Sequence, residues 1–337
     1  MPEPFQILSL SGGGIRGLYT ISVLATIEEF LADESGVENY NIADHFSLIS
    51  GTSIGGILAL GLASGINARK LQKLLDDNRK LIFPYHWQNR IPFLAGLLLI
   101  IKRSRKSLYD SAALHKLLND TFTNKRIGDL NTAIIIPTVN GTTGLPRMFK
   151  TPHHENFVRD YKHSLVDVAL ATTAAPTYLD PHLFDHSYMV DGGLIANSPA
   201  FIACHEATNF LNKDKAFVHL LSIGTMGSQT ALKSEKNNKW GYLNGWRMGK
   251  TLLELTLSSN EGMHNFITKQ ILGENFNLLD DNNTPDQSEV ITLDNSSDAA
   301  AQMLRSRGIN QGQNALGDKN IKAFFKEKAQ SPHFYRK

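Results

Sequence analysis

Residues 46–63 read FSLISGTSIGGILALGLA, and this stretch carries the strongest indication of fold in the chain. The apolar run Phe46–Ile49 predicts a short buried strand. Residues Ile54–Ala63 predict a helix whose glycines and alanines allow close packing on a sheet. The turn between them, Gly51–Gly55, reads GTSIG and fits the pattern G-x-S-x-G. A strand, a tight turn and a helix in this order are typical of an α/β fold.

The serine at the centre of this turn is a candidate nucleophile. Gly51 and Gly55, two residues before and two after Ser53, leave room for a strained turn that lifts the hydroxyl out of the sheet. The amides at the start of the following helix carry a partial positive charge. We therefore expect Ser53 to attack a substrate.

Strands and helices alternate along the rest of the chain. Further strands are predicted at Phe5–Leu10, Ala133–Val139, Tyr188–Val190 and Phe217–Ile223. Further helices are predicted at Leu18–Phe30, Leu71–Leu81, Ala112–Phe122, Leu165–Thr173, Ser198–Asn209 and Met248–Leu272. This alternation predicts an α/β fold with a mainly parallel central sheet and helices on both faces.

We expect a single domain. Residues 1–226 form the predicted α/β core, and residues 227–337 a polar loop and a helical C-terminal elaboration packed on it. The loop from Gly227 to Gly245 is polar and contains glycine, and a second polar stretch follows at Asp280–Ser288. A pair of helices is expected to end the chain.

A glycine-rich loop follows the first predicted strand, where residues 9–20 read SLSGGGIRGLYT. The loop fits G-x-G-x-x-G, which also occurs in dinucleotide-binding proteins. Such a site needs an acidic residue that ends a second strand, but Asp33 and Glu34 close a predicted helix instead. A P-loop needs a lysine after its last glycine, and none is present.

Beside a nucleophilic serine, this loop suits a different task. The amides of Gly12, Gly13 and Gly14 can approach a substrate carbonyl closely and stabilise the oxyanion that forms during attack. Arg16, which precedes Gly17, can add positive charge to the loop or bind a phosphate. A nucleotide-binding module that uses Gly12–Gly17 remains the alternative.

The base that activates the serine is expected to be a carboxylate. Twelve histidines are available for a Ser-His-Asp triad, but none lies in a glycine-marked turn. Asp191 ends the short strand Tyr188–Val190 and precedes Gly192 and Gly193. A carboxylate in such a turn can accept the serine proton directly, although Asp-Gly turns are also common for structural reasons.

Three motifs together resemble the patatin-like phospholipase family: GGGIRG, GTSIGG and DGGLIANSP, in this order. The resemblance extends from about Phe5 to Ile223 and includes TTAAPTYL at Thr172–Leu179. It implies hydrolysis of fatty-acyl esters of membrane glycerophospholipids through an acyl-enzyme, without metal or cofactor. The roles that it implies are a nucleophile, a base, three oxyanion donors and two supporting residues: Ser53; Asp191; Gly12, Gly13 and Gly14; Asn197 and Pro199. The segment SIGTM departs from the family, because many members have glycine in place of Met226.

Composition and hydropathy bear on location and partners. The net charge of +2 gives no reason to expect a nucleic-acid polymer as partner, and one cysteine, Cys204, fits a reducing cytosol. No secretory signal is recognisable, and the apolar run Ile91–Ile101 is shorter than the roughly 20 residues of a spanning helix. We expect a cytoplasmic protein that acts at the inner face of the membrane.

A membrane-docking segment is one interpretation of this apolar run. The basic cluster Lys102–Lys106 follows it, and Phe83, Tyr85 and Trp87 precede it. An apolar patch with aromatic and basic flanks suits insertion to headgroup depth. A buried core helix with a solvated basic end explains the same pattern equally well.

The resemblance also bears on regulation. The short form of the chain is similar to bacterial members, some of which are activated by cyclic dinucleotides in anti-phage defence, while housekeeping lipases look similar. A cyclic-dinucleotide activator and a homo-oligomer formed on activation are therefore expected partners. Residues 227–245 and the C-terminal helices are where a regulatory ligand is expected, because the three motifs leave them unexplained.

Overall fold

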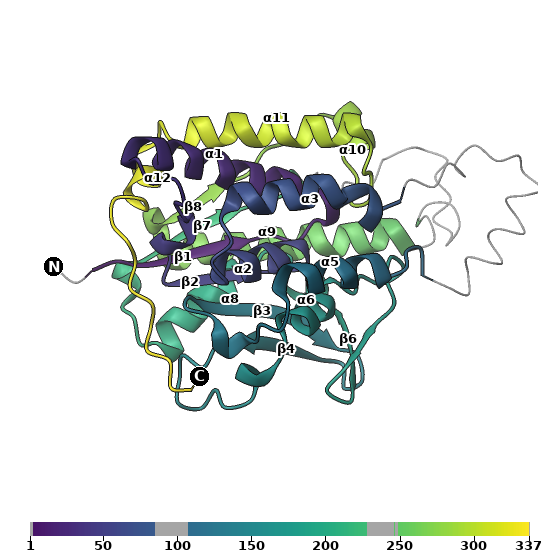
Figure 1. The fold of residues 1–337 in the computed structure, drawn as a ribbon, viewed down its shortest axis with the longest axis horizontal. Coiled ribbons are helices and arrows are strands. Elements are labelled where there is room, and N and C mark those ends of the chain that lie inside the picture. Colours follow the sequence, from purple (N-terminus) through teal and green to yellow (C-terminus); the bar gives the residue numbers. More distant parts are fainter. Residues whose placement is uncertain (1–2, 85–106, 228–245, 247–248, 337) are drawn as a thin grey trace, which may run out of the picture.

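The computed structural model describes residues 3–84, 107–227, 246 and 249–336, and these ranges form an eight-stranded sheet covered by helices (Figure 1). The strand order is β5-β6-β3-β2-β1-β7-β8, and β4 pairs with β3 beside this path. The strands are β1 Phe5–Leu10, β2 Leu48–Gly51, β3 Ala133–Asn140, β4 Leu145–Lys150, β5 His182–Phe184, β6 Ser187–Asp191, β7 Val218–Ile223 and β8 Phe276–Leu279.

The centre of the sheet is parallel and one end is antiparallel. Strand β1 runs parallel to β2 and β7, and β2 with β3 and β7 with β8 are also parallel pairs. The pairs β3 with β4, β3 with β6, and β5 with β6 are antiparallel. The predicted α/β fold with a mainly parallel sheet is confirmed.

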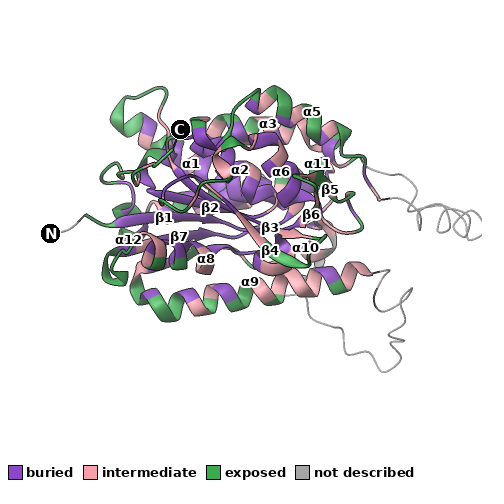
Figure 2. Ribbon diagram, turned by 90° about the horizontal axis from the view of Figure 1, so that it is seen from below, coloured by how far each residue is buried: buried purple, intermediate pink, exposed green. Residues whose placement is uncertain are grey.

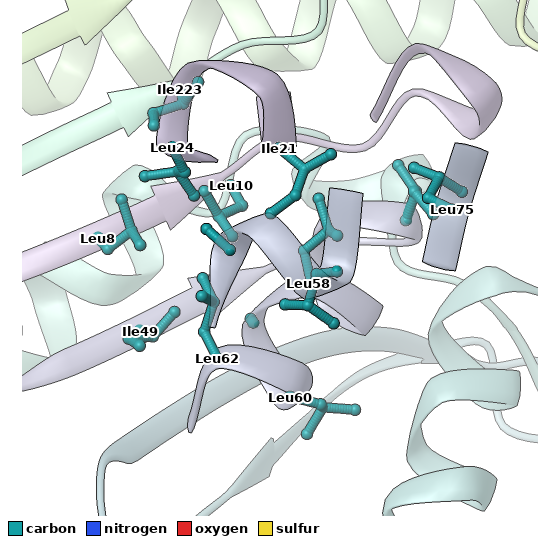
Figure 3. Packing of buried hydrophobic residues seen from close by; sticks show 14 of the residues in the cluster. Leu8, Leu10, Ile21, Leu24, Ile49, Leu58, Leu60, Leu62, Leu75 and Ile223 are labelled. Carbon is teal, nitrogen blue, oxygen red and sulfur yellow. The ribbon is translucent and has the colours of Figure 1, made fainter. Parts of the chain in front are cut away.

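Alternation along β1 explains why helices cover both faces of the sheet (Figure 2). Leu8 and Leu10 belong to one buried cluster, whereas Phe5 and Ile7 belong to another. Figure 3 shows the first cluster, where helices pack over β1 and β2. Its helices are α1 Gly17–Ser35, α2 Ile54–Ala63, α3 Ala68–Ile82, α5 Ala112–Phe122, α6 Leu165–Thr173 and α11 Asp298–Ala315. On the other face lie α8 Ala200–His205 and α9 Lys250–Leu272.

Three short helices complete the described chain: α7 Gly193–Ala196, α10 Pro285–Val290 and α12 Lys319–Ala323. None of the helices in the described ranges is long and apolar enough to cross a bilayer.

The structure differs from the predicted elements in several places. The predicted helix Ser198–Asn209 is split into α8 and a π-helical turn at Glu206–Phe210. The strands β4, β5 and β8 were not predicted, and α10 occupies part of the polar stretch expected at residues 280–288. The C-terminal part is therefore not only helical, because β8 extends the central sheet beside β7.

Candidate active site

The turn between β2 and α2 places Ser53 in a strained backbone conformation. Its φ is 55° and its ψ is −126°, in a region that residues with a side chain rarely adopt. A Cβ at Gly51 would collide with the carbonyl group of Gly55, and a Cβ at Gly55 would collide with the carbonyl oxygen of Leu10. Glycine at both positions is therefore what allows this sharp turn at the carboxyl end of β2.

Hydrogen bonds hold the strained turn from both sides. The Ser53 amide donates to Thr172 Oγ1 at 3.0 Å, and that hydroxyl donates to the Pro137 carbonyl oxygen at 2.6 Å. Thr52 Oγ1 donates to the Ala196 carbonyl oxygen at 2.6 Å. The serine is thus tied to α6, to β3 and to the short helix α7 that follows Asp191.

Asp191 meets Ser53 at the end of β6, although 138 residues separate them in sequence. Ser53 Oγ donates to Asp191 Oδ2 at 2.7 Å, and the Gly193 amide donates to Asp191 Oδ1 at 2.7 Å. The carboxylate is 5% exposed. Burial raises the pKa of Asp191 to about 6, against the two hydrogen bonds, which lower it. The site therefore holds a serine hydroxyl against a buried carboxylate.

In the part of the chain that the structure describes, no histidine hydrogen-bonds to either of these two side chains. The ring of His264 contacts the Ser198 carbonyl oxygen instead, at 2.8 Å. His153 is buried and bonds to Glu206 at 3.0 Å. The local arrangement is a two-residue Ser–Asp pair.

The glycine-rich loop after β1 lies beside Ser53. Gly13 and Gly14 line the same pocket as Ser53, and no hydrogen-bond acceptor for their amides is found among the described residues. Gly12 was expected to donate to an oxyanion as well, but its amide already donates to the Asn197 carbonyl oxygen at 2.9 Å. Thr225 Oγ1 donates to the Gly12 carbonyl oxygen at 3.2 Å. Gly12 thus anchors the loop and leaves two amides open.

An apolar pocket of about 850 Å³, its open mouth included, begins at Ser53 and Asp191. Side chains from several helices and from the loops beside them form its walls, and most of them are hydrocarbon. These are Ile54, Ile57, Ile82, Phe83, Leu114, Leu179, Leu194, Leu253, Leu257 and Leu293. The pocket can therefore receive a hydrocarbon chain attached to a group that reacts at Ser53.

A polar cavity of about 1370 Å³, again with its open mouth, lies next to this pocket. Arg16 lines it and is 9% exposed, and its Nε has no hydrogen-bond partner among the described residues. Lys250, Glu254, Glu261 and Asp280 also line the cavity. Burial raises the pKa of Glu261 and raises that of Asp280 to about 7. The two spaces share three residues: Asn197, Leu257 and Leu293.

The other predicted residues lie around the site. Gly17 begins α1 next to Ile54, Gly192 and Gly193 form the turn after β6, and Pro199 precedes α8. Phe83 lies at the end of α3. The proposed docking segment, including Tyr85, Trp87, Ile91–Ile101 and Lys102–Lys106, and the loop at 228–245 lie outside the described residues.

Residues of α9 that the sequence motifs do not predict contact the segment after Asp191. Asn197 Nδ2 donates to Glu261 Oε2 at 2.7 Å, and the Asn197 amide donates to Asn260 Oδ1 at 2.7 Å. The only signal in the sequence is a polar pair, Asn260 and Glu261, within a predicted helix. Among the described residues, no group of three or more His, Cys, Asp or Glu side chains is arranged to hold a metal ion.

Comparison with known proteins agrees with the three motifs. Residues 8–204 match the family model for patatin-like phospholipase. A cGAMP-activated phospholipase of Vibrio cholerae is 42% identical over 318 residues, which cover 90% of this chain and 89% of the relative. Proteins of the same name from Pseudomonas aeruginosa and Escherichia coli are 40% and 39% identical, over 98% and 90% of this chain and 95% and 87% of their own lengths.

These matches extend beyond the segment that carries the motifs and confirm the predicted resemblance. The family model alone covers more than half of the chain, and the relatives match it almost from end to end. The chain belongs to the patatin-like phospholipase family and is a lipid ester hydrolase.

Proposed function

We propose that Ser53 and Asp191 form a catalytic dyad that cleaves fatty-acyl esters of membrane glycerophospholipids. The observation that carries this proposal is the 2.7 Å hydrogen bond from Ser53 Oγ to a buried Asp191 carboxylate at the start of an apolar pocket. A carboxylate with a pKa of about 6 is largely ionised at neutral pH and can still accept a proton.

The reaction proceeds in two steps. Ser53 Oγ attacks the ester carbonyl carbon while its proton passes to Asp191 Oδ2. The tetrahedral intermediate then expels the lysolipid alkoxide, which takes the proton from Asp191 and leaves an acyl-enzyme. A water molecule attacks the acyl-enzyme, with Asp191 again accepting the proton, and the fatty acid leaves as Ser53 recovers its hydrogen.

The oxyanion of each tetrahedral intermediate binds to the amides of Gly13 and Gly14. These two amides line the pocket with Ser53, and no acceptor for them is found in the described chain. Gly12 takes a supporting part, because its amide bonds to Asn197. Preorganised amides of this kind typically contribute about 3 kcal/mol each to transition-state binding.

The substrate class is supported by the apolar pocket, whose leucine and isoleucine walls suit an acyl chain. We assign the substrate to the inner face of the membrane, where a cytoplasmic enzyme meets glycerophospholipids. The segment proposed to dock on that surface lies outside the described residues, so the docking role stays a prediction from sequence.

Activation by a cyclic dinucleotide, with homo-oligomer formation, is the second part of the proposal. The activator is supported by the relatives named cGAMP-activated phospholipase, which match this chain over 90% or more of its length. Homo-oligomer formation stays a prediction from the sequence resemblance. Two cations, Arg16 and Lys250, line the polar cavity beside the active pocket and can pair with a phosphodiester, although Glu254, Glu261 and Asp280 line it too. A role in anti-phage defence follows if the activator is made on infection.

The test is fatty-acid release from phosphatidylethanolamine–phosphatidylglycerol vesicles, with and without cGAMP. Wild type should release fatty acid, with a rate that rises when cGAMP is added. Ser53→Ala and Asp191→Ala should lose at least about a thousandfold in rate. The controls Ser64→Ala, at the other end of α2, and Asp180→Ala, on the surface, should retain it.

Three results would reject parts of this proposal. Equal fatty-acid release by wild type and Ser53→Ala would reject the catalytic dyad. Tight NAD binding without fatty-acid release would favour the alternative, in which the Gly12–Gly17 loop binds a nucleotide. Release that cGAMP does not change would leave the hydrolase and reject the activator.

A further inference from the structure

Helix α9 contacts the segment after Asp191 through polar side chains. Four of its residues bond to residues 193–198, and the proposed chemistry uses none of them: Asn260, Glu261, His264 and Asn265. The helix lies outside the part of the chain matched by the family model, 8–204. Its contacts therefore need an explanation of their own.

Asn260 occupies a position inside the hydrogen-bond ladder of α7. In an α-helix the amide of residue 197 would donate to the carbonyl oxygen of residue 193. Here the Asn197 amide donates to Asn260 Oδ1 at 2.7 Å, and Asn260 Nδ2 donates to the Gly193 carbonyl oxygen at 2.7 Å. One side-chain amide thus replaces a backbone hydrogen bond and links the two groups that would have formed it.

Both ends of this bridge lead to the reacting groups. Gly193 donates its amide to Asp191 Oδ1 at 2.7 Å, so the peptide groups that flank Gly193 are held by Asp191 on one side and Asn260 on the other. The Asn197 carbonyl oxygen accepts from the Gly12 amide at 2.9 Å. Asn260 therefore contacts the turn of the base and the anchor of the oxyanion loop.

We propose that Asn260 is a positioning residue that fixes the Asp191 carboxylate and the Gly12–Gly14 loop relative to each other. This inference rests on the proposed function, since it assigns Asn260 to the assembly of that dyad. A side-chain amide suits the position, because the Gly193 carbonyl oxygen needs a donor and the Asn197 amide needs an acceptor. An aspartate would present a carboxylate to the Gly193 carbonyl oxygen.

The charged groups around the dyad do not duplicate this role. Asp110 lines the apolar pocket, and Arg16 and Glu261 line the polar cavity across Asn197. The pKa of Asp191 responds to burial and to its bonds from Gly193 and Ser53, and not to these charges. Loss of the Gly193 bond would move the pKa of Asp191 upward.

The first experiment measures the rate at which a fluorophosphonate labels Ser53 between pH 4.5 and 9, in the full chain with cGAMP present. Asn260→Ala should slow labelling at least about tenfold and move the acid limb of the profile to higher pH. The control is Ser259→Ala, next to Asn260 on the exposed side of α9, which removes a 3.2 Å bond to the Thr256 carbonyl oxygen without touching Gly193 or Asn197. It should label as wild type does.

If both variants label equally slowly and the acid limb of the pH profile stays at its wild-type position, Asn260 has only a structural role and the proposal is overturned. A wild-type rate in Asn260→Ala would do the same. If Asn260→Ala does not fold, Asn260→Asp keeps the size and one acceptor, and should slow labelling in the same direction.

Hydrogen exchange at the Asn197 amide tests the bridge without reference to activity. That amide should exchange at least about tenfold faster in Asn260→Ala and at the wild-type rate in Ser259→Ala. Unchanged exchange in Asn260→Ala would reject the bridge. If the fluorophosphonate does not label wild type, the proposed function is rejected instead. Hydrogen exchange at the Asn197 amide would still show whether Asn260 holds residues 193–197.

Discussion

Asp191 lies where water is largely excluded, and its ionised form is stabilised by only two described hydrogen bonds. Burial dominates, so the pKa of the carboxyl rises to about 6. The Asp191 carboxyl is therefore harder to ionise in the folded protein than in the unfolded chain, and it titrates close to neutral pH. This is a general feature of sites whose function opposes stability.

Asp191→Asn should therefore stabilise the protein at high pH. A carboxyl with a folded pKa above its unfolded value binds its proton more tightly in the folded state. Its contribution to stability is thus greatest below about pH 4 and falls as pH rises through 4 to 6. A shift of two units corresponds to at most about 3 kcal/mol. Thermal melting should show the variant above wild type at pH 8 and level with it at pH 4. A variant that melts lower at pH 8 would contradict this account.

Among the elements, α1 and α11 pack unusually closely because α11 carries two glycines one turn apart. A Cβ at Gly308 would lie 2.6 Å from Ser22 Cβ and 2.7 Å from the Tyr19 carbonyl oxygen. At Gly312 it would lie 2.8 Å from Thr26 Cβ. The backbones of the two helices therefore approach each other where side chains would keep them apart.

Gly308→Ala should destabilise the protein by about 1–3 kcal/mol, because the added methyl group overpacks this contact. The control is Gly262→Ala in α9, where a Cβ would meet nothing within 4 Å. That variant should be stabilised by up to about 1 kcal/mol through helix propensity. Chemical denaturation measures both, and equal effects of the two substitutions would show that α1 and α11 are not closely packed.

The elements that carry the motifs were predictable, whereas others were not. Helices α2, α5 and α6 begin and end at the predicted residues, because their apolar patterns are long and their boundaries carry clear signals. Strand β8 has four residues, FNLL, and too few positions to show a period of two. Strand β5 has three and pairs with β6 in a tight hairpin. Its turn residues, Asp185 and His186, both have positive φ without the glycine that usually marks such a hairpin in sequence.

The same distinction applies to the site. Ser53 and Asp191 lie in turns with recognisable sequences, so their meeting could be predicted from the motifs. Asn260 acts through residues 63 and 67 positions away in sequence, and nothing around it in the sequence distinguishes it from a solvated helix residue. The bond from Gly12 to Asn197 was missed because backbone partners between distant turns leave no trace in either motif.

At the scale of the whole molecule, the C-terminal part completes the fold that the N-terminal part begins. Strand β8 pairs with β7, α11 packs on α1, and α9 covers the second face of the sheet. Cys204 lies in that second cluster with Leu272 of α9 and Phe276 of β8. We therefore expect residues 227–337 to fold with the core as one unit.

A fragment of residues 1–226 should consequently fail to fold, because it leaves β7 as an unpaired edge and exposes the apolar cluster beneath α9. Cys204 offers the readout, since it is 1% exposed and burial raises the pKa of its thiol to about 11. Ellman's reagent should react slowly with the native full chain and rapidly with the fragment. A fragment with a cooperative melt and a protected thiol would show that residues 1–226 form a separate domain.

The most direct test of the Ser–Asp dyad is the pH dependence of kcat/KM for a soluble acyl ester, measured with cGAMP for wild type and Asp191→Asn. The account predicts that the wild-type value rises with a single ionisation near pH 6 and then levels. It also predicts that the variant is about a thousandfold slower at every pH. Two results would contradict the claim that Asp191 takes the proton of Ser53. One is an Asp191→Asn variant with kcat/KM within tenfold of wild type. The other is loss of the ionisation near pH 6 when a histidine is replaced.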